Sequence, residues 1–171
     1  MIENVNAFVV CVDDTRIQLD LRSIHYCETF MEQRAIFLAD LEWMTHGKHT
    51  MLLSLAESEI ATADVVRPLV AALNEYADKA LPETLTDSDG GPLIPPSVRA
   101  DLKPLLRSED LAVKAFLVSK ALRSRFLESL MGAVLATHIR NMSDEEKAKR
   151  LRRGAPPPVQ EVGDDTDYMW N

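Results

Sequence analysis

The 171-residue sequence has few glycines, and it lacks any long run of uncharged residues in its C-terminal half. Its six glycines include one adjacent pair, Gly90-Gly91, which precedes a proline, so no Walker loop or dinucleotide-binding fingerprint is present. The longest uncharged stretch in that half, residues 129–139, is well short of the roughly 20 residues of a membrane-spanning helix. We therefore expect neither a nucleotide site nor a membrane partner.

Cysteine is also scarce, with Cys11 and Cys27 each inside an apolar stretch. Two buried free thiols are the simplest interpretation, which favours a reducing compartment. The N-terminal residues lack the positive charge and the small-residue cleavage site of a secretory signal. These features together predict a soluble protein of the cytoplasm.

Charge is unevenly distributed along the chain, whose formal net charge is -8. Residues 101–153 carry 12 bases against 7 acids, whereas residues 154–171 carry four acids and no base. An acidic surface as a whole disfavours binding to nucleic acid. The basic segment and the acidic tail are complementary, either within one chain or between neighbours.

The overall pattern predicts a mainly α protein, with a helical bundle-like body, a small N-terminal β-hairpin and an extended C-terminal arm. Ile17, Leu19 and Leu21 alternate with polar residues, and residues 7–12 form a β-rich run, so a hairpin with a turn at 13–15 is expected. The alternative places residues 14–44 in one long helix.

Helical periodicity follows from Cys27 to Met44, with Arg34 among the residues assigned to the solvent side. Residues 51–81 have room for two helices or one kinked helix, with a break between Ile60 and Asp64. We expect Asp64 to cap the second helix, which would leave Pro68 near its first turn.

Prolines and glycines then mark a boundary at residues 82–96, between an N-terminal region, 1–81, and a C-terminal helical region, 97–153. Within the latter we expect a short helix ending near Arg107, a cap at Ser108 and one long helix over 109–141. Its segment 129–139 is apolar on every side, which predicts burial all round. Residues 143–146 match a capping box for a last helix.

Candidate chemistry is sparse. His25, Cys27, His46 and His49 fall close together in sequence, and their side chains are the ligands that zinc prefers. Their spacing matches no established zinc motif, and Cys27 as a nucleophile would need a positioned base. A zinc or thiol enzyme around Cys27 is therefore only an alternative, and we expect no enzyme, no metal and no cofactor.

The last predicted helix is strongly basic. Its five bases could neutralise several phosphates, but no aromatic or amide side chains accompany them to read bases. A small nucleic-acid-associated regulator is thus a second alternative, and a docking surface for an acidic segment is preferred. The bases are Lys147, Lys149, Arg150, Arg152 and Arg153.

The tail, residues 154–171, combines a stiff proline spacer, acidic residues and terminal aromatics, and this composition is typical of a docking motif. The alternative is that the tail packs on its own body. We expect a non-enzymatic adaptor, structural or assembly protein, such as those of bacterial virus particles, which docks a protein partner or joins an oligomer through this arm. The predicted contact residues are Asp164, Asp165, Asp167, Tyr168, Met169 and Trp170.

Overall fold

A computed structural model describes residues 5–41, 49–55 and 57–154, and it contains seven α-helices, one 3-10 helix and a three-stranded sheet in those ranges. The prediction of a mainly α protein with an N-terminal hairpin is confirmed. The chain divides into two units, Met1–Arg140 and Asn141–Asn171, which are described separately. The predicted arm beyond Gly154 lies outside the described residues.

Strands β1 (Val5–Val10) and β2 (Arg16–Leu19) form the predicted hairpin, so the alternative of one helix over 14–44 is wrong. The turn contains no glycine; instead Asp14 takes the left-handed conformation, with φ of +60°. Aspartate tolerates this conformation better than most residues. Asp13 stabilises the same turn by accepting a 3.3 Å hydrogen bond from the Thr15 amide.

Strand β3 (His49–Ser54) was not predicted, because these residues were assigned to a loop followed by a helix. It pairs in parallel with β1, giving the order β2-β1-β3. Met51 and Leu53 point into the core while Leu52 is exposed, as alternation in a strand requires. A short apolar run is ambiguous between helix and strand, and the pairing that decides it is with a segment over 40 residues earlier.

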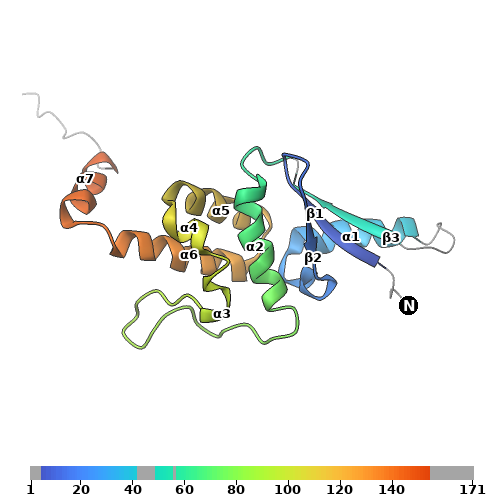
Figure 1. Ribbon diagram of the computed structural model, residues 1–171, viewed down its shortest axis with the longest axis horizontal. Helices are drawn as coiled ribbons and strands as arrows, with labels where there is room; N and C mark the ends of the chain where they lie inside the picture. The colour runs from blue at the N-terminus through green and yellow to red at the C-terminus, as the bar shows by residue number, and fades with distance from the viewer. Residues whose placement is uncertain (1–4, 42–48, 56, 155–171) are drawn as a thin grey trace, which may run out of the picture. The chain divides into compact units, whose positions relative to one another are not determined.

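Between β2 and β3 the chain forms the 3-10 helix η1 (Leu21–Tyr26) and helix α1 (Glu28–Leu41). Asp20 caps η1 by accepting a 2.9 Å hydrogen bond from the Arg22 amide. Helix α1 packs on η1 and on β3, as Figure 1 shows beside the sheet. The side-chain amide of Gln33 both donates to and accepts from the backbone of Ser54, at 3.1 and 2.8 Å.

Helix α2 (Ala63–Glu75) has Thr62 as its N-cap, two residues before the predicted cap Asp64, which lies in the first turn. The described residues before it, 51–55 and 57–60, form strand, turn and loop rather than helix. Asp13 Oδ2 accepts a 3.2 Å hydrogen bond from the Ala63 amide, so the hairpin turn contacts the first turn of α2. Pro68 is buried inside the helix.

After a long loop, two short helices, α3 (Pro96–Arg99) and α4 (Lys103–Arg107), lead to α5 (Glu109–Ala121). The predicted cap at Ser108 is confirmed, because its hydroxyl accepts from the Leu111 amide at 3.3 Å. Helices α2 and α5, which flank the loop in sequence, pack against each other in one core.

The single helix predicted over 109–141 is wrong, because residues 122–124 separate α5 from α6 (Arg125–Arg140). Arg123 has a φ of +52°, which ends α5, and the Ser124 hydroxyl accepts from the Leu127 amide at 3.3 Å. The break lets α6 fold back onto α5. Burial all round is also wrong for the end of α6, where Ile139 is 56% exposed.

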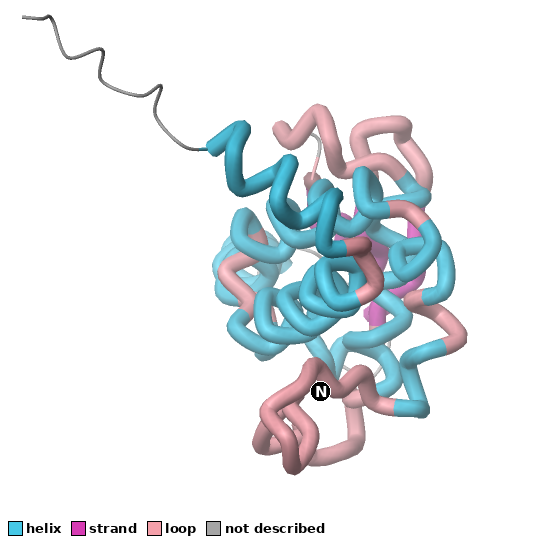
Figure 2. Tube along the Cα trace, turned by 90° about the vertical axis from the view of Figure 1, so that its left-hand side faces the viewer, coloured by secondary structure: helices cyan, strands magenta, loops and turns pink. Residues whose placement is uncertain are grey.

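The core of the first unit joins the inner face of the sheet to the helices. Helix α2 stands between the sheet and α5, so the strands lie on one side of the helices (Figures 1 and 2). Residues from every strand and from α2, α5 and α6 belong to one buried apolar cluster. No helix within the described ranges combines the length and apolar character that a membrane crossing needs.

Helix α7 (Asp144–Gly154) belongs to the second unit. Its predicted capping box is confirmed by two reciprocal hydrogen bonds. The Ser143 amide donates to Glu146 Oε2 at 3.1 Å, and the Glu146 amide donates to Ser143 Oγ at 3.2 Å.

Candidate protein-docking site

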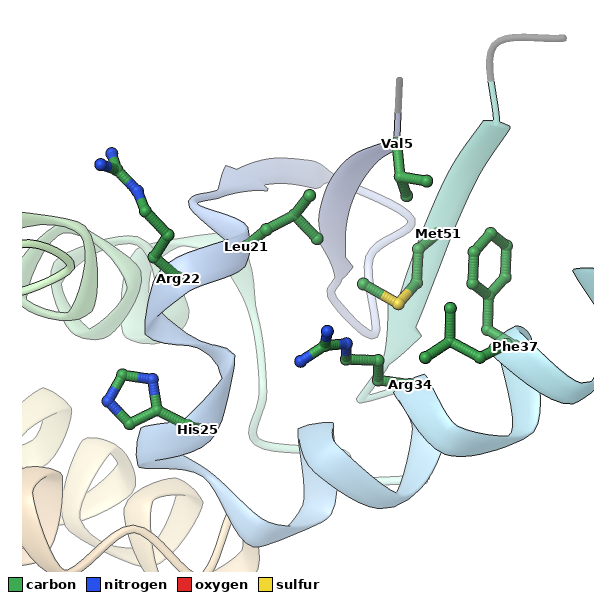
Figure 3. A pocket seen from close by; sticks show the side chains of 8 residues that line it. Val5, Leu21, Arg22, His25, Arg34, Phe37 and Met51 are labelled. Atoms are coloured by element: carbon green, nitrogen blue, oxygen red, sulfur yellow. The ribbon is translucent and has the colours of Figure 1, made fainter. Parts of the chain in front are cut away.

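A pocket of about 320 Å³ lies between η1, α1 and the inner face of the sheet, and we call it the Arg34 pocket (Figure 3). Its walls come from segments that are far apart in sequence but are brought together by the parallel pairing of β1 and β3. Three polar side chains and five apolar ones line it. They are Arg22, His25, Arg34, Val5, Leu21, Phe37, Leu38 and Met51.

The central polar group is Arg34. Figure 3 shows its guanidinium directed from α1 into the space bordered by Leu21, His25 and Met51. The side chain is half-buried, and among the described residues no hydrogen bond or ion pair to it is found. A guanidinium carries five donors in a fixed fork that matches a carboxylate or phosphate. An unpaired, half-buried guanidinium therefore makes this pocket attractive to an anion.

Arg22 differs from Arg34 because its charge is already balanced. Its guanidinium pairs with Asp20, at 2.6 Å, and with Asp78 on the far side of η1, and Figure 3 shows it directed away from the pocket. The hydrogen bonds from Arg22 hold the pKa of the Asp20 carboxyl below its usual value. We infer that Arg22 stabilises η1 and that Arg34 is the residue available to a ligand.

Helix α1 leaves much of its apolar surface uncovered. Among its described side chains Phe30 alone is fully buried, while Met31 and Ile36 are 41% and 65% exposed. Phe37 and Leu38 are half-buried at the pocket wall. Scattered exposed apolar residues are normal, but here they share one helix with Arg34 and the pocket beside it. This combination is typical of a surface that binds another protein.

The predicted basic docking surface lies on α7, away from the Arg34 pocket in sequence and in the other unit. Lys147 is 3.4 Å from Asp144, and Lys149, Arg150 and Arg152 are exposed on the same helix as Arg153. The two groups of bases are thus separate features. Nucleic-acid binding by α7 stays a prediction, to be tested by salt-dependent binding to a random duplex.

All six predicted contact residues of the tail, from Asp164 to Trp170, lie outside the described residues. Their role as a docking motif accordingly stays a prediction. Their composition, acidic and aromatic, is nevertheless what the Arg34 pocket could accommodate.

The residues proposed for zinc or thiol chemistry are not assembled. Cys27 is fully buried, and burial raises the pKa of its thiol from 9.0 to about 12, despite a hydrogen bond with Ser124. His25 is exposed, His49 begins β3, and His46 lies outside the described residues. Nowhere in the described ranges do three His, Cys, Asp or Glu side chains come together as metal ligands. A protonated, buried thiol is a poor nucleophile.

Sequence reasoning missed the pocket because it assigned Arg34 to the solvent side of its helix. The signal was present in the spacing: Arg34 follows Phe30 by four residues and precedes Phe37 and Leu38 by three and four. Residues at these spacings share a helix face, so Arg34 lies on the apolar side. A cation within an apolar face indicates a partner anion.

The arrangement offers one oriented cation above an apolar floor, open on one side. Such a site can hold a group that is anionic at one end and apolar at the other. Comparisons of the sequence with models of known protein families and with curated proteins gave no match.

Proposed function

We propose that this protein is a non-enzymatic adaptor or assembly protein, which docks a protein partner or another copy of itself through its C-terminal arm. The observation that carries the proposal is the surface formed by α1 and the Arg34 pocket. It presents apolar side chains together with Arg34, a cation that pairs with no acid in the described part of the chain.

The energetic argument concerns α1. A helix of fourteen residues that buries one described side chain completely gains little from its own chain. Most helical stability in proteins comes from burying an apolar face. Covering Phe37 and Leu38 at the pocket wall with a partner would supply burial of the kind that interfaces use, at roughly 25 cal/mol for each Å² of apolar surface.

The arm supplies the second half of the proposal. Its acidic residues repel one another, and its prolines favour an extended spacer. Tyrosine, methionine and tryptophan are enriched where interfaces carry their binding energy. An exposed receiving surface and an arm of complementary character are the two parts that an assembly protein requires.

Sedimentation velocity of the intact chain and of a chain lacking residues 155–171 tests the proposal. We expect concentration-dependent association, with itself or with an added partner, for the intact chain only. The core lies within the first unit, so we expect the circular dichroism and thermal unfolding of both chains to agree. Identical association of the two folded chains would contradict the proposal.

A further inference from the structure

We propose that the Arg34 pocket receives the acidic-aromatic segment Asp164–Trp170 of a second copy of this chain. The inference rests on the proposed function and adds to it the identity of the partner and the receiving residues. It joins a pocket in which no described acid pairs with Arg34 to a segment of the same chain that is rich in acids.

The electrostatic part of the argument begins with Arg34. A half-buried guanidinium without an anion has lost part of its hydration and gained no ion pair. Asp164, Asp165 and Asp167 lie within one to six residues of the aromatic anchors, so a carboxylate can reach Arg34 when an anchor occupies the pocket. Arginine binds carboxylate through two parallel hydrogen bonds, which is stronger and more directional than a lysine contact.

The apolar part concerns the floor. Val5, Leu21 and Phe37 provide aliphatic and aromatic surface within one pocket. Its volume of about 320 Å³ is at the lower end of ligand pockets, which span roughly 300–1,000 Å³. Such a space can accommodate one aromatic side chain. Tyr168 and Trp170 are the candidates from the tail.

A second copy is a better source of the segment than the same chain. Helix α6 ends at Arg140 on the side of the first unit away from the sheet, whereas the pocket lies beside the sheet (Figure 1). The tail of a neighbouring copy can reach the pocket without passing around the core of the chain that contains this pocket. The 17 residues from Gly154 to Trp170 extend up to about 60 Å, which is enough to bridge adjacent copies.

Charge reversal in two full-length variants tests the inference. The pocket variant carries Arg34→Glu, and the tail variant carries Asp164→Lys, Asp165→Lys and Asp167→Lys. In the pocket variant a carboxylate faces an acidic tail, and in the tail variant an arginine faces a basic one. We expect each alone to self-associate about tenfold or more weakly than the natural chain by sedimentation velocity.

Mixing the two variants should restore association, because each pocket then meets a tail of opposite charge. Arg99→Glu on α3 is the matched control, with the same change of charge at an exposed arginine outside both the pocket and the basic surface of α7. We expect it to associate as the natural chain does. Phe37→Ser, which removes apolar lining without changing charge, should weaken association in every pairing, including the mixture.

The outcomes separate the inference from the proposed function. If deletion of residues 155–171 weakens association but Arg34→Glu does not, the arm docks elsewhere, and the inference alone fails. If Arg152→Glu on α7 has a larger effect than Arg34→Glu, α7 is the receiving surface. If the mixture stays as weak as its components although both variants unfold at the natural temperature, the paired contact is absent. If deletion of the arm has no effect, both proposals fail.

Discussion

Helices α1 and α2 both contact the sheet region, but α2 buries many of its side chains and α1 buries few. Of the thirteen residues of α2, seven are buried, and the helix lies between the sheet and α5. Among the described side chains of the longer α1, only Phe30 is buried. The comparison teaches that one helix builds the core and the other is fixed to its edge and offers a surface.

Removing the Phe30 side chain should give the largest loss of stability among the changes that test this difference between α1 and α2. Replacing it with alanine should lower the free energy of unfolding by about 3–5 kcal/mol, because a fully buried ring is removed and a cavity remains. Urea unfolding followed by circular dichroism measures the change. Met31→Ala, at a neighbouring exposed residue, should cost about 0.5 kcal/mol or less. Equal effects would show that α1 is not anchored through Phe30.

The buried thiols should make the fold sensitive to alkali. Burial raises the pKa of Cys27 from 9.0 to about 12 and that of Cys11 to about 11, so unfolded chains lose these protons first. Stability is therefore full below pH 9 and falls as pH rises toward 12, by at most about 1.4 kcal/mol per pH unit for each thiol. Urea midpoints under reducing conditions measure the slope.

Cys27→Ala provides the control for this alkaline loss. The variant should be less stable near neutral pH because of the cavity it leaves, but its stability should fall less steeply above pH 9. An unchanged slope would assign the alkaline loss to other groups.

The cap of η1 should contribute a smaller amount. Asp20→Ala removes the acceptor for the Arg22 amide and guanidinium, and we expect a loss of about 1 kcal/mol, as for other helix N-caps. Because the pKa of Asp20 is lowered in the fold, its contribution is present above the usual pKa and is lost as pH falls. The variant should accordingly show a shallower decline in acid. A parallel decline would exclude this carboxyl as the cause.

Ile36 should have the smallest effect on folding. Its side chain is 65% exposed on α1, so Ile36→Ser should change the free energy of unfolding by about 0.5 kcal/mol or less. Calorimetry or urea unfolding at low protein concentration measures this. A loss above about 1 kcal/mol would mean that this side of α1 is covered within a single chain.

Local patterns predicted the elements whose causes are local. The hairpin, the Ser108 cap and the capping box of α7 each depend on residues close together in sequence. Strand β3 depends instead on β1, and no window around residues 49–54 contains that partner. The turn at 122–124 was missed because it has no glycine or proline, and Arg123 adopts its left-handed conformation within the folded chain.

The candidate site was harder to predict for the same reason. The Arg34 pocket needs β1, β3, η1 and α1 to be assembled, so a wrong assignment of β3 removes one wall. Sequence reasoning directed attention to the α7 bases because five of them fall within seven residues. An isolated arginine is visible as a site only when the fold shows that no described acid is paired with it.

Gln33 has a consequence for how copies of this chain can associate. Its amide offers Ser54 one donor and one acceptor, as the peptide group of a further strand would. The Gln33 side chain thereby occupies one end of the edge strand β3, where a strand of another molecule could otherwise pair. Pairing of this end of β3 with a strand of another molecule is therefore opposed, so the association that we propose would have to use contacts between side chains.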